Sequence, residues 1–410
     1  SLVIRILLVV ILGFVVIFNR PKTNDKIDSI NIPKEGSPQK PGSGFSSVSV
    51  PSSSSSSNSL LSQLSMINAR SFPALSKNQL PNKVPAFFGR KDVLLEVMGR
   101  TWQSGGAICL YGGKGAGKTS LALELAHQLA PKYPDAQFYF DLNGGGDRPL
   151  PVSKAMGHVL RAFFPKEPLP NDPGKLIQEY DGALKGKRVL MLIENVSKPS
   201  QIKRLMMGKS GLIIYTSSEK TLSPGAYVKP VKELFPDEAE LLLFFYASHS
   251  KRWASDINEL CGYSPLAISL AGSYLKSNPD ISLETWVREL REEKRLMKPE
   301  SEDELSSGND KKEIIDRNVE PLFNMIFRDL KKETATVFRK LALFASSFDE
   351  KAVAAICGDR EGDHLKRLVS LKFVEHDTIN NRFYIHELIH KLIKAEVRPS
   401  EKILTHRNLA

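Results

Sequence analysis

The chain has 410 residues, of which 41% are hydrophobic and 25% charged, a composition close to that of an average globular protein. This length excludes a peptide or a purely fibrous protein and predicts two or three domains. The formal net charge of +11 favours anionic partners without choosing between a membrane surface and nucleic acid. Three widely separated cysteines lack metal-ligand spacing, so we expect reduced thiols in a cytosolic body.

The N-terminal segment is apolar. Residues 2–18 are nearly all Leu, Ile, Val or Phe, which meets the lower limit of about 17 helical residues for a membrane span. Basic residues follow on the C-terminal side, namely Arg20, Lys22 and Lys26. We therefore predict a transmembrane helix at 1–19 and a single-pass membrane protein whose body lies in the cytoplasm. A cleaved signal peptide and a buried core helix remain alternatives, although no small-x-small cleavage pattern follows the run.

The next segment is rich in polar and turn-forming residues. Ser, Pro, Gly, Asn and Lys dominate residues 20–83, and Ser52–Ser57 is an unbroken serine run. Too few apolar side chains are present to offset the conformational entropy of ordering the chain. We predict a disordered tether here.

Strand and helix patterns alternate in the segment that follows, 84–233. Short apolar runs and helical periodicities succeed one another at Ala107–Tyr111, Lys118–Ala130, Gln137–Leu142, Pro151–Phe164, Arg188–Ile193, Pro199–Met207 and Gly211–Thr216. Strands that alternate with helices pair in parallel. The fold class is therefore α/β with a parallel sheet.

Helical patterns dominate the remainder of the chain. We predict a helical domain at 234–297, an acidic linker at 298–316 and a winged-helix domain at 317–398, in which short strands at Phe373–Glu375 and Phe383–Ile385 form the wing. Residues 399–410 resemble the start of a further helical region, such as a repeat. The chain begins at Ser1 and ends inside this region, so we expect a fragment at both ends.

One motif identifies a phosphate-binding loop. The sequence Gly112-Gly113-Lys114-Gly115-Ala116-Gly117-Lys118-Thr119 fits G-x-x-x-x-G-K-[S/T], follows an apolar strand and opens a helix. Its backbone N–H groups and the helix N-terminus attract phosphate oxygens, Lys118 reaches the β- and γ-phosphates, and the Thr119 hydroxyl ligates Mg²⁺. We assign nucleotide binding to this loop, together with Ser120, and expect ATP or ADP with Mg²⁺ as cofactors.

A second apolar strand ends in Glu194-Asn195. In P-loop enzymes the acidic residue at this place holds the Mg²⁺ shell, so we predict Glu194 as a metal ligand beside Thr119. Asn195 follows where many ATPases carry a catalytic Glu, and an amide accepts no proton from water. We assign Lys118, Glu194 and Asn195 to the chemical step. Because one strand intervenes in the sequence, we also expect a strand between the Walker A and Walker B strands of the sheet.

Three further motifs resemble those of one family. Pro85–Asp92 is similar to the entry motif of the NB-ARC or AP-ATPase branch of the STAND P-loop NTPases, Cys261–Ile268 to its G-x-P motif, and Phe383–Leu388 to its Met-His-Asp motif. The resemblance implies that Phe88 packs on adenine, that Arg90 lies near the nucleotide, that Pro265 presses on the adenine or sugar, and that His386 reaches the β-phosphate of ADP.

The chain also departs from that family pattern. Ser218 stands where an arginine usually senses the γ-phosphate, and Glu387 replaces an aspartate. We therefore expect nucleotide binding and at most a slow ATPase.

The function that this pattern favours is a membrane-tethered nucleotide switch for signalling or regulation, with self-association in the active state and an unknown protein stimulus as partners. The alternatives are a constitutive ATPase and a nucleotide-controlled winged-helix DNA-binding regulator. We do not expect DNA as a partner, because residues 364–371 lack an evident set of base-reading side chains.

Overall fold

A computed structural model describes residues 76–85, 87–100, 106–143, 149–206, 211–220, 225–297, 317–344, 347–378 and 381–398. The predicted membrane helix, most of the predicted tether, all of the predicted linker and the C-terminal region lie outside these residues. Within the described ranges, no helix has the length and apolar character that a membrane span requires.

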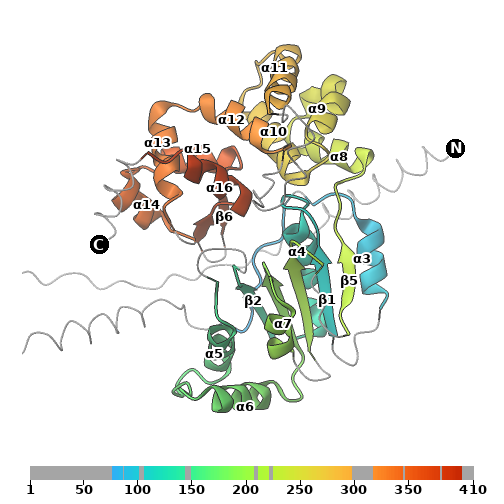
Figure 1. The fold of residues 1–410 in the computed structure, drawn as a ribbon, viewed down its shortest axis with the longest axis vertical. Helices are drawn as coiled ribbons and strands as arrows, with labels where there is room; N and C mark the ends of the chain where they lie inside the picture. The colour runs from blue at the N-terminus through green and yellow to red at the C-terminus, as the bar shows by residue number, and fades with distance from the viewer. Residues whose placement is uncertain are drawn as a thin grey trace, which may run out of the picture. The chain divides into compact units, whose positions relative to one another are not determined.

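The N-terminal part of the described chain contains a parallel sheet with strand order β2-β3-β4-β1-β5 (Figure 1). Its strands are β1 (Gly106–Tyr111), β2 (Ala136–Asp141), β3 (Val189–Glu194), β4 (Leu212–Ser217) and β5 (Tyr227–Pro230). As the sequence predicts, a strand lies between β1, which leads into the P-loop, and β3, and this strand is β4. The paired positions Tyr111–Ser217 and Asp141–Glu194 bring the carboxyl ends of the strands to one edge.

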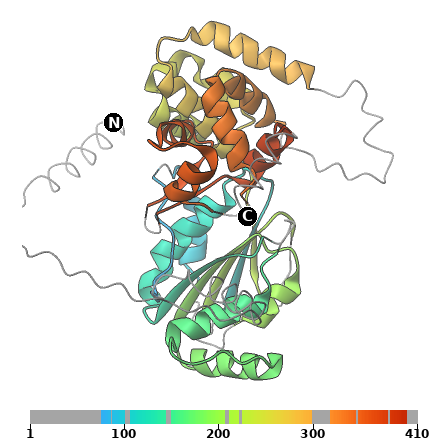
Figure 2. The same ribbon diagram turned by 90° about the vertical axis from the view of Figure 1, so that its left-hand side faces the viewer.

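Helices cover both faces of this sheet, and Figure 2 shows it between them. The helices are α3 (Lys91–Met98), α4 (Lys118–Leu129), α5 (Val152–Phe163), α6 (Pro173–Leu184) and α7 (Pro199–Leu205), and a short 3₁₀ helix, Ala130–Lys132, follows α4. Successive residues of β1 point to opposite faces of the sheet, so they belong to two different apolar cores. Cys109 packs with α5–α7, whereas Ile108 and Leu110 pack with α3 and α4.

The end of the predicted tether is structured. Gln137 of β2 donates its N–H to Lys77 O at 2.6 Å, and Gln79 donates to Gln137 O at 2.8 Å. Leu80 is buried in the core beside α4. Residues 76–83 therefore belong to the sheet domain, because they complete its hydrogen bonding and its core.

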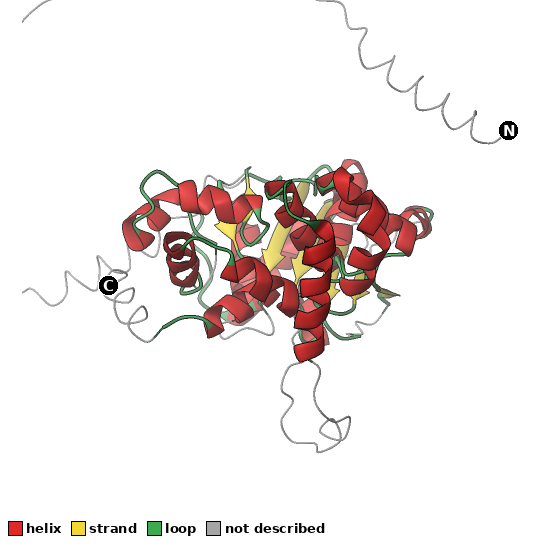
Figure 3. Ribbon diagram, turned by 90° about the horizontal axis from the view of Figure 1, so that it is seen from above, coloured by secondary structure: helices red, strands yellow, loops and turns green. Residues whose placement is uncertain are grey.

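The C-terminal part is helical. Its elements are α8 (Pro236–Tyr246), a 3₁₀ helix (Ser248–Trp253), α9 (Ala254–Leu260), α10 (Pro265–Ser277), α11 (Leu283–Leu296), α12 (Glu320–Arg328), α13 (Lys332–Leu341), α14 (Glu350–Cys357), α15 (Asp363–Ser370), the hairpin β6 (Glu375–Asp377) with β7 (Arg382–Tyr384), and α16 (Glu387–Ala395). Viewed from above, these helices lie in front of the strands (Figure 3).

A single apolar core runs through the regions that we predict as helical and winged-helix domains. Within it, Phe323 of α12 contacts Phe338 of α13 and Phe373, with ring centroids 6.3 and 5.5 Å apart. The same cluster includes Leu270 of α10 and Leu290 of α11. The two helical regions are therefore packed as one body in this structure.

Candidate nucleotide-binding site

The P-loop, Gly112–Gly117, connects the end of β1 to the start of α4. Two of its glycines have physical reasons to be glycine. A Cβ at Gly112 would lie 2.2 Å from the backbone oxygen of Val231, and Gly117 has a φ of 81°, in the left-handed region. The first turn of α4 carries no acidic side chain. The helix N-terminus is thus electrostatically suited to an anion.

The side chain of Lys118, the first residue of α4, lies over the P-loop. Its Nζ donates hydrogen bonds to Gly112 O at 3.1 Å and to Gly113 O at 2.8 Å. Burial lowers the pKa of Lys118, while the carboxylates of Glu387 and Glu194 oppose this shift. The ammonium group therefore lies over the P-loop, where the motif predicts it.

Glu194 is buried at the end of β3, with 6% of its surface exposed. Burial, followed by the charge of Asp141, raises the pKa of Glu194 to about 7, against hydrogen bonding from Thr119 and Tyr139. Tyr139 Oη donates to Oε2 at 3.2 Å, whereas Oε1 has no hydrogen-bond partner at ordinary distance in the described part of the chain. A buried oxygen without a partner has a large desolvation cost that a cation would relieve.

These residues fit Mg²⁺. The Thr119 hydroxyl and the Glu194 carboxylate supply oxygen ligands of the kind that Mg²⁺ prefers, and they come from α4 and β3, as predicted. Across the described residues, no group of three or more His, Cys, Asp or Glu side chains forms a metal cage. A two-residue site matches Mg²⁺ that is bound together with nucleotide phosphates, where the ion would neutralise phosphate charge.

Asn195 is positioned by two hydrogen bonds to its neighbours. Its backbone N–H donates to Thr216 Oγ1 at 3.2 Å, and its side-chain Nδ2 donates to Asp141 Oδ1 at 2.9 Å. The backbone φ of Asn195 is 54°. Asp141 was not among the predicted site residues. The signal that would have found it is the pattern of a polar residue ending an apolar strand, which β2 shares with β3.

Arg90 contacts the backbone of the P-loop through its guanidinium group. Arg90 is 8% exposed, and its Nη2 donates to Ala116 O at 2.6 Å and to Lys232 O at 2.7 Å. Burial lowers the pKa of Arg90, and the nearby carboxylates, Glu238 first, oppose the shift. The contact with Ala116 places Arg90 against the P-loop, so it shapes the loop backbone directly.

Phe88 lies where the sheet domain meets α8. Its ring packs against the ring of Phe245 with centroids 5.8 Å apart. Both side chains are partly exposed, and Phe245 retains 47% of its surface. These rings are an accessible aromatic pair beside the entry motif.

The helical region touches the P-loop through the start of α10. A Cβ at Gly117 would lie 3.4 Å from Pro265 Cγ. Ser264 Oγ and the Leu266 N–H each donate to Gly115 O at 3.4 Å. Pro265 also suits the first position of α10, since its missing N–H would have no partner there.

The winged-helix region reaches the same loop through the start of α16. His386 caps this helix, with Nδ1 accepting the Leu388 N–H at 3.2 Å, and Lys114 Nζ donates to Glu387 Oε1 at 2.9 Å. Burial and the cations Lys118 and Lys114 lower the pKa of His386, against the carboxylates Glu375 and Glu387. The starts of α10 and α16 thus both contact the P-loop.

Two serines, Ser217 and Ser218, stand at the end of β4. The Ser217 hydroxyl donates to Val196 O at 2.8 Å, and Ser218 is exposed. The structure therefore agrees with the sequence in lacking an arginine at the position where the family resemblance places a γ-phosphate sensor.

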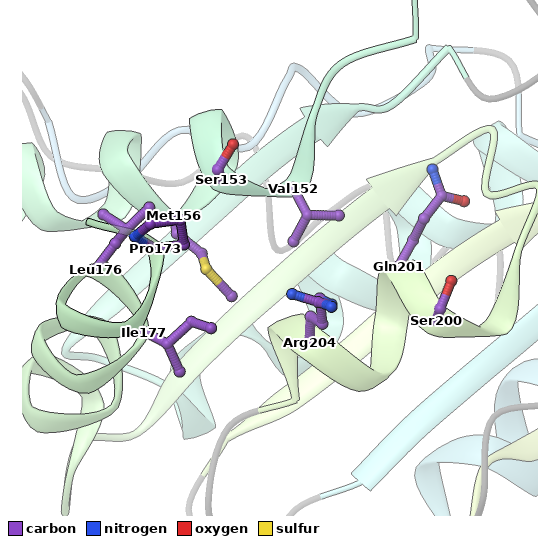
Figure 4. A pocket seen from close by; sticks show the side chains of 9 residues that line it. All are labelled: Val152, Ser153, Met156, Pro173, Leu176, Ile177, Ser200, Gln201 and Arg204. Atoms are coloured by element: carbon purple, nitrogen blue, oxygen red, sulfur yellow. The ribbon is translucent and has the colours of Figure 1, made fainter. Parts of the chain in front are cut away.

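A separate pocket of about 280 Å³ lies between α5, α6 and α7 (Figure 4). Its apolar wall comes mainly from α5 and α6, and Ser200, Gln201 and Arg204 of α7 form a polar side. It is lined by Val152, Ser153, Met156, Pro173, Leu176, Ile177, Ser200, Gln201 and Arg204. None of the predicted nucleotide-site residues belongs to this lining.

Comparison with known proteins identifies regulatory relatives. No protein-family model matches the sequence. The chain is 29% identical over 353 residues to the regulatory protein AfsR of Streptomyces griseus and 30% identical over 366 residues to that of Streptomyces coelicolor. The alignments cover 82% and 83% of this chain but 35% of each relative. The chain therefore spans about a third of the length of these regulators.

The fold is similar to that of a solved signal transduction ATPase. A STAND protein with a tetratricopeptide repeat sensor from Pyrococcus horikoshii superimposes with a TM-score of 0.57 at 16% identity, covering 82% of this chain and 46% of that one. At this identity the likeness shows the fold alone. The chain thus has an α/β parallel-sheet fold like that of P-loop NTPases, followed by helical regions.

Proposed function

We propose that this chain is a nucleotide-dependent regulatory switch of the NB-ARC type, which binds ADP or ATP with Mg²⁺ and changes its domain arrangement on exchange. One observation carries the proposal: a single P-loop is contacted both by α10 of the helical region, at Gly115, and by α16 of the winged-helix region, at Lys114. Any ligand held by that loop lies beside both contacts. The similarity to regulatory proteins supports the same conclusion.

In this proposal, different residues bind the phosphates, the Mg²⁺ ion, and the base and sugar. Lys118 and the N-terminus of α4 compensate phosphate charge, and Thr119 with Glu194 would hold Mg²⁺. Phe88 and Pro265 would pack on the base and sugar, as the family resemblance implies. His386 is a neutral imidazole at pH 7, because its pKa is lowered, and it can hydrogen bond to a diphosphate without adding charge.

Switching requires two nucleotide states that favour different domain contacts. ADP stabilises the packed arrangement, in which α10 and α16 both touch the P-loop. ATP binds better to an arrangement in which these contacts are loosened, so exchange shifts the population. The displaced regions then form the surface for self-association, and a protein stimulus promotes the exchange.

Turnover is expected to be slow. Asn195 bonds to Asp141 and accepts no proton, and Ser218 brings no positive charge to the γ-phosphate. In related phosphoryl-transfer proteins an arginine at such a place is worth about 10³ to 10⁵ in rate. Lys118 and Glu194 remain, so binding survives while chemistry is slow.

We further propose a membrane setting. The apolar segment 1–19 anchors the chain, and the Ser-rich segment that follows connects the anchor to a cytoplasmic body. Deleting residues 1–18 should give a protein that no longer fractionates with membranes and binds nucleotide as before. Release of the full chain by carbonate extraction would contradict the anchor.

Mass spectrometry of the nucleotide that the purified protein carries tests the proposal. We expect ADP at close to one molecule per chain, and none in a Lys118→Ala variant purified in parallel. If the wild-type protein carries no nucleotide and also binds neither ADP nor ATP in a calorimetric titration with Mg²⁺, the switch proposal is wrong.

A further inference from the structure

The P-loop carries a lysine that its motif does not require. The motif constrains Gly112, Gly117, Lys118 and Thr119, whereas Lys114 stands at a position open to any residue. In the structure this side chain crosses to the winged-helix region, where Nζ donates to Glu387 Oε1 at 2.9 Å. A cation of the phosphate-binding loop is therefore paired with a carboxylate from a segment more than 270 residues away in the sequence.

The surroundings of this pair allow it to break at low cost. The Lys114 side chain is 25% exposed and the Glu387 side chain 47% exposed, so both ends remain in contact with water. Glu387 is also the first residue of α16, where the helix dipole stabilises its charge with or without Lys114. Breaking the pair therefore leaves no buried charge without a partner, whereas breaking a buried ion pair does.

Phosphate competes for the same ammonium. Lys114 lies between Gly113 and Gly115, in the loop whose N–H groups face the phosphates, so its Nζ has a second acceptor when nucleotide is bound. The additional terminal phosphate of a triphosphate strengthens that competition beyond what a diphosphate offers. The same phosphate repels Glu387, which adjoins the loop.

We propose that Lys114 is a triphosphate-sensing residue whose pairing with Glu387 holds α16 to the P-loop in the diphosphate state and is exchanged for the terminal phosphate in the triphosphate state. This inference rests on the proposed nucleotide binding and specifies how the site distinguishes ATP from ADP. A second contact, from Asn82 Nδ2 to Thr378 Oγ1, joins the sheet domain to the wing and is independent of the loop. Loss of the Lys114 pair alone therefore loosens α16 without detaching the wing.

Calorimetric titrations of the full chain with ADP and with a hydrolysis-resistant ATP analogue, both with Mg²⁺, test the proposal. Lys114→Met should reduce the preference for the ATP analogue over ADP by about five- to tenfold, the effect of one partly exposed charged contact. Glu387→Gln should increase that preference by about two- to fivefold, because it frees Lys114 from its competitor.

A matched control exists in the same chain. Lys229 Nζ pairs with Glu96 Oε2 at 2.5 Å, with side chains 25% and 41% exposed, and neither residue belongs to the P-loop or the winged-helix region. Lys229→Met should leave the preference at the wild-type value. Hydrogen exchange of the first turn of α16 should be faster with the ATP analogue than with ADP in wild-type protein, and equally fast with both in Glu387→Gln.

The possible results separate the two proposals. If wild-type protein binds both nucleotides but Lys114→Met and Glu387→Gln keep its preference, the sensing role is wrong and nucleotide binding stands. If wild-type protein binds neither nucleotide, nucleotide binding itself is wrong. If Lys114→Met shifts the preference no more than Lys229→Met does, the effect is one of general charge, which also contradicts the sensing role.

Discussion

At the residue scale, the P-loop is the feature that depends least on the rest of the chain. Gly112 has no room for a side chain beside Val231, Gly117 adopts the left-handed backbone that favours glycine, and Lys118 returns over the loop carbonyls. These requirements are local, so a sequence pattern captures them. The same pattern cannot show that Lys114 has a distant partner.

Lys118 gives the first prediction. Lys118→Ala should weaken ADP and ATP binding by at least about a hundredfold, because the variant lacks the cation that compensates phosphate charge. The fold should persist, since among the described residues the Lys118 ammonium donates to Gly112 O and Gly113 O, both within the loop itself. Calorimetry measures the affinity and circular dichroism the fold. Lys203→Ala, an exposed lysine on α7, is the control, and undiminished ADP affinity in Lys118→Ala would remove the P-loop assignment.

Glu194 gives a prediction of pH dependence. Its pKa in the folded protein is about 7, above the ordinary value of 4.5, so between these values the folded protein holds a proton that the unfolded chain has lost. The free energy of unfolding should therefore decrease as pH rises from about 4.5 to 7, by on the order of 3 kcal/mol. Glu194→Gln should lack this part of the decrease.

Thermal unfolding without Mg²⁺ or nucleotide, at a series of pH values, measures this difference between wild type and Glu194→Gln. The exposed Glu240 on α8 supplies the control variant, Glu240→Gln, which should keep the wild-type profile. A wild-type profile in Glu194→Gln would mean that this carboxyl is ionised throughout the range.

The partners of other site residues could not be predicted, because they depend on spatial neighbours; the sequence marks Asp141 as the polar end of an apolar strand but does not show what it contacts. Asp141 approaches Asn195 only because β2 and β3 pair in register, which places Asp141 opposite Glu194. Glu238 approaches Arg90 across 148 residues of sequence. Single-sequence patterns contain neither relation.

At the element scale, Glu238 joins the start of α8 to the start of α3. Its Oε1 accepts the Arg90 N–H at 2.7 Å, and its Oε2 accepts the Phe235 N–H at 3.1 Å. The carboxylate also lies over Gly89, where a Cβ would come within 2.2 Å of it. One carboxylate thus accepts the backbone N–H groups of the two residues that directly precede α3 and α8, and these helices belong to different regions.

Removing that carboxylate should destabilise the fold. Glu238→Ala should reduce the free energy of unfolding by about 1 to 3 kcal/mol, because two backbone donors lose a charged acceptor. It should also weaken nucleotide binding, since Arg90 holds Ala116 of the P-loop. Urea denaturation with Glu240→Ala as the control measures the stability effect. Equal stability of the two variants would contradict this role.

The helices and strands also show which elements a sequence pattern predicts accurately and which it misses. Long periodic helices such as α4 and α5 match their predicted ranges to within one residue at each end. Helix α6 was not predicted, because Pro173, Gly174 and Gly182 interrupt its helical pattern. Strand β5 was not predicted either, since its four residues lie at the sheet edge and are only partly buried, which gives no continuous apolar run. The wing strands lie up to two residues from their predicted positions.

At the scale of the whole molecule, the regions predicted as helical and winged-helix domains are packed against each other. They share one apolar core. A sequence shows which faces are apolar but not which of them meet, so this packing could not be predicted. Because of the shared core, we expect α10 and α16, which both touch the P-loop, to move together if nucleotide exchange displaces either one.

This coupling can be measured with two spin labels on the full chain. The native cysteines, Cys109, Cys261 and Cys357, are all buried, so labels can be directed to new exposed sites. Lys175→Cys on α6 and Lys351→Cys on α14 place one label on the sheet domain and one on the winged-helix region.

The distance distribution between these labels, recorded by pulsed electron spin resonance with ADP and then with a hydrolysis-resistant ATP analogue and Mg²⁺, tests the central claim most directly. A nucleotide switch predicts one narrow population with ADP and a second, longer-distance population with the ATP analogue. The same distribution with both nucleotides, at concentrations that calorimetry shows to be saturating, would contradict nucleotide-controlled domain arrangement.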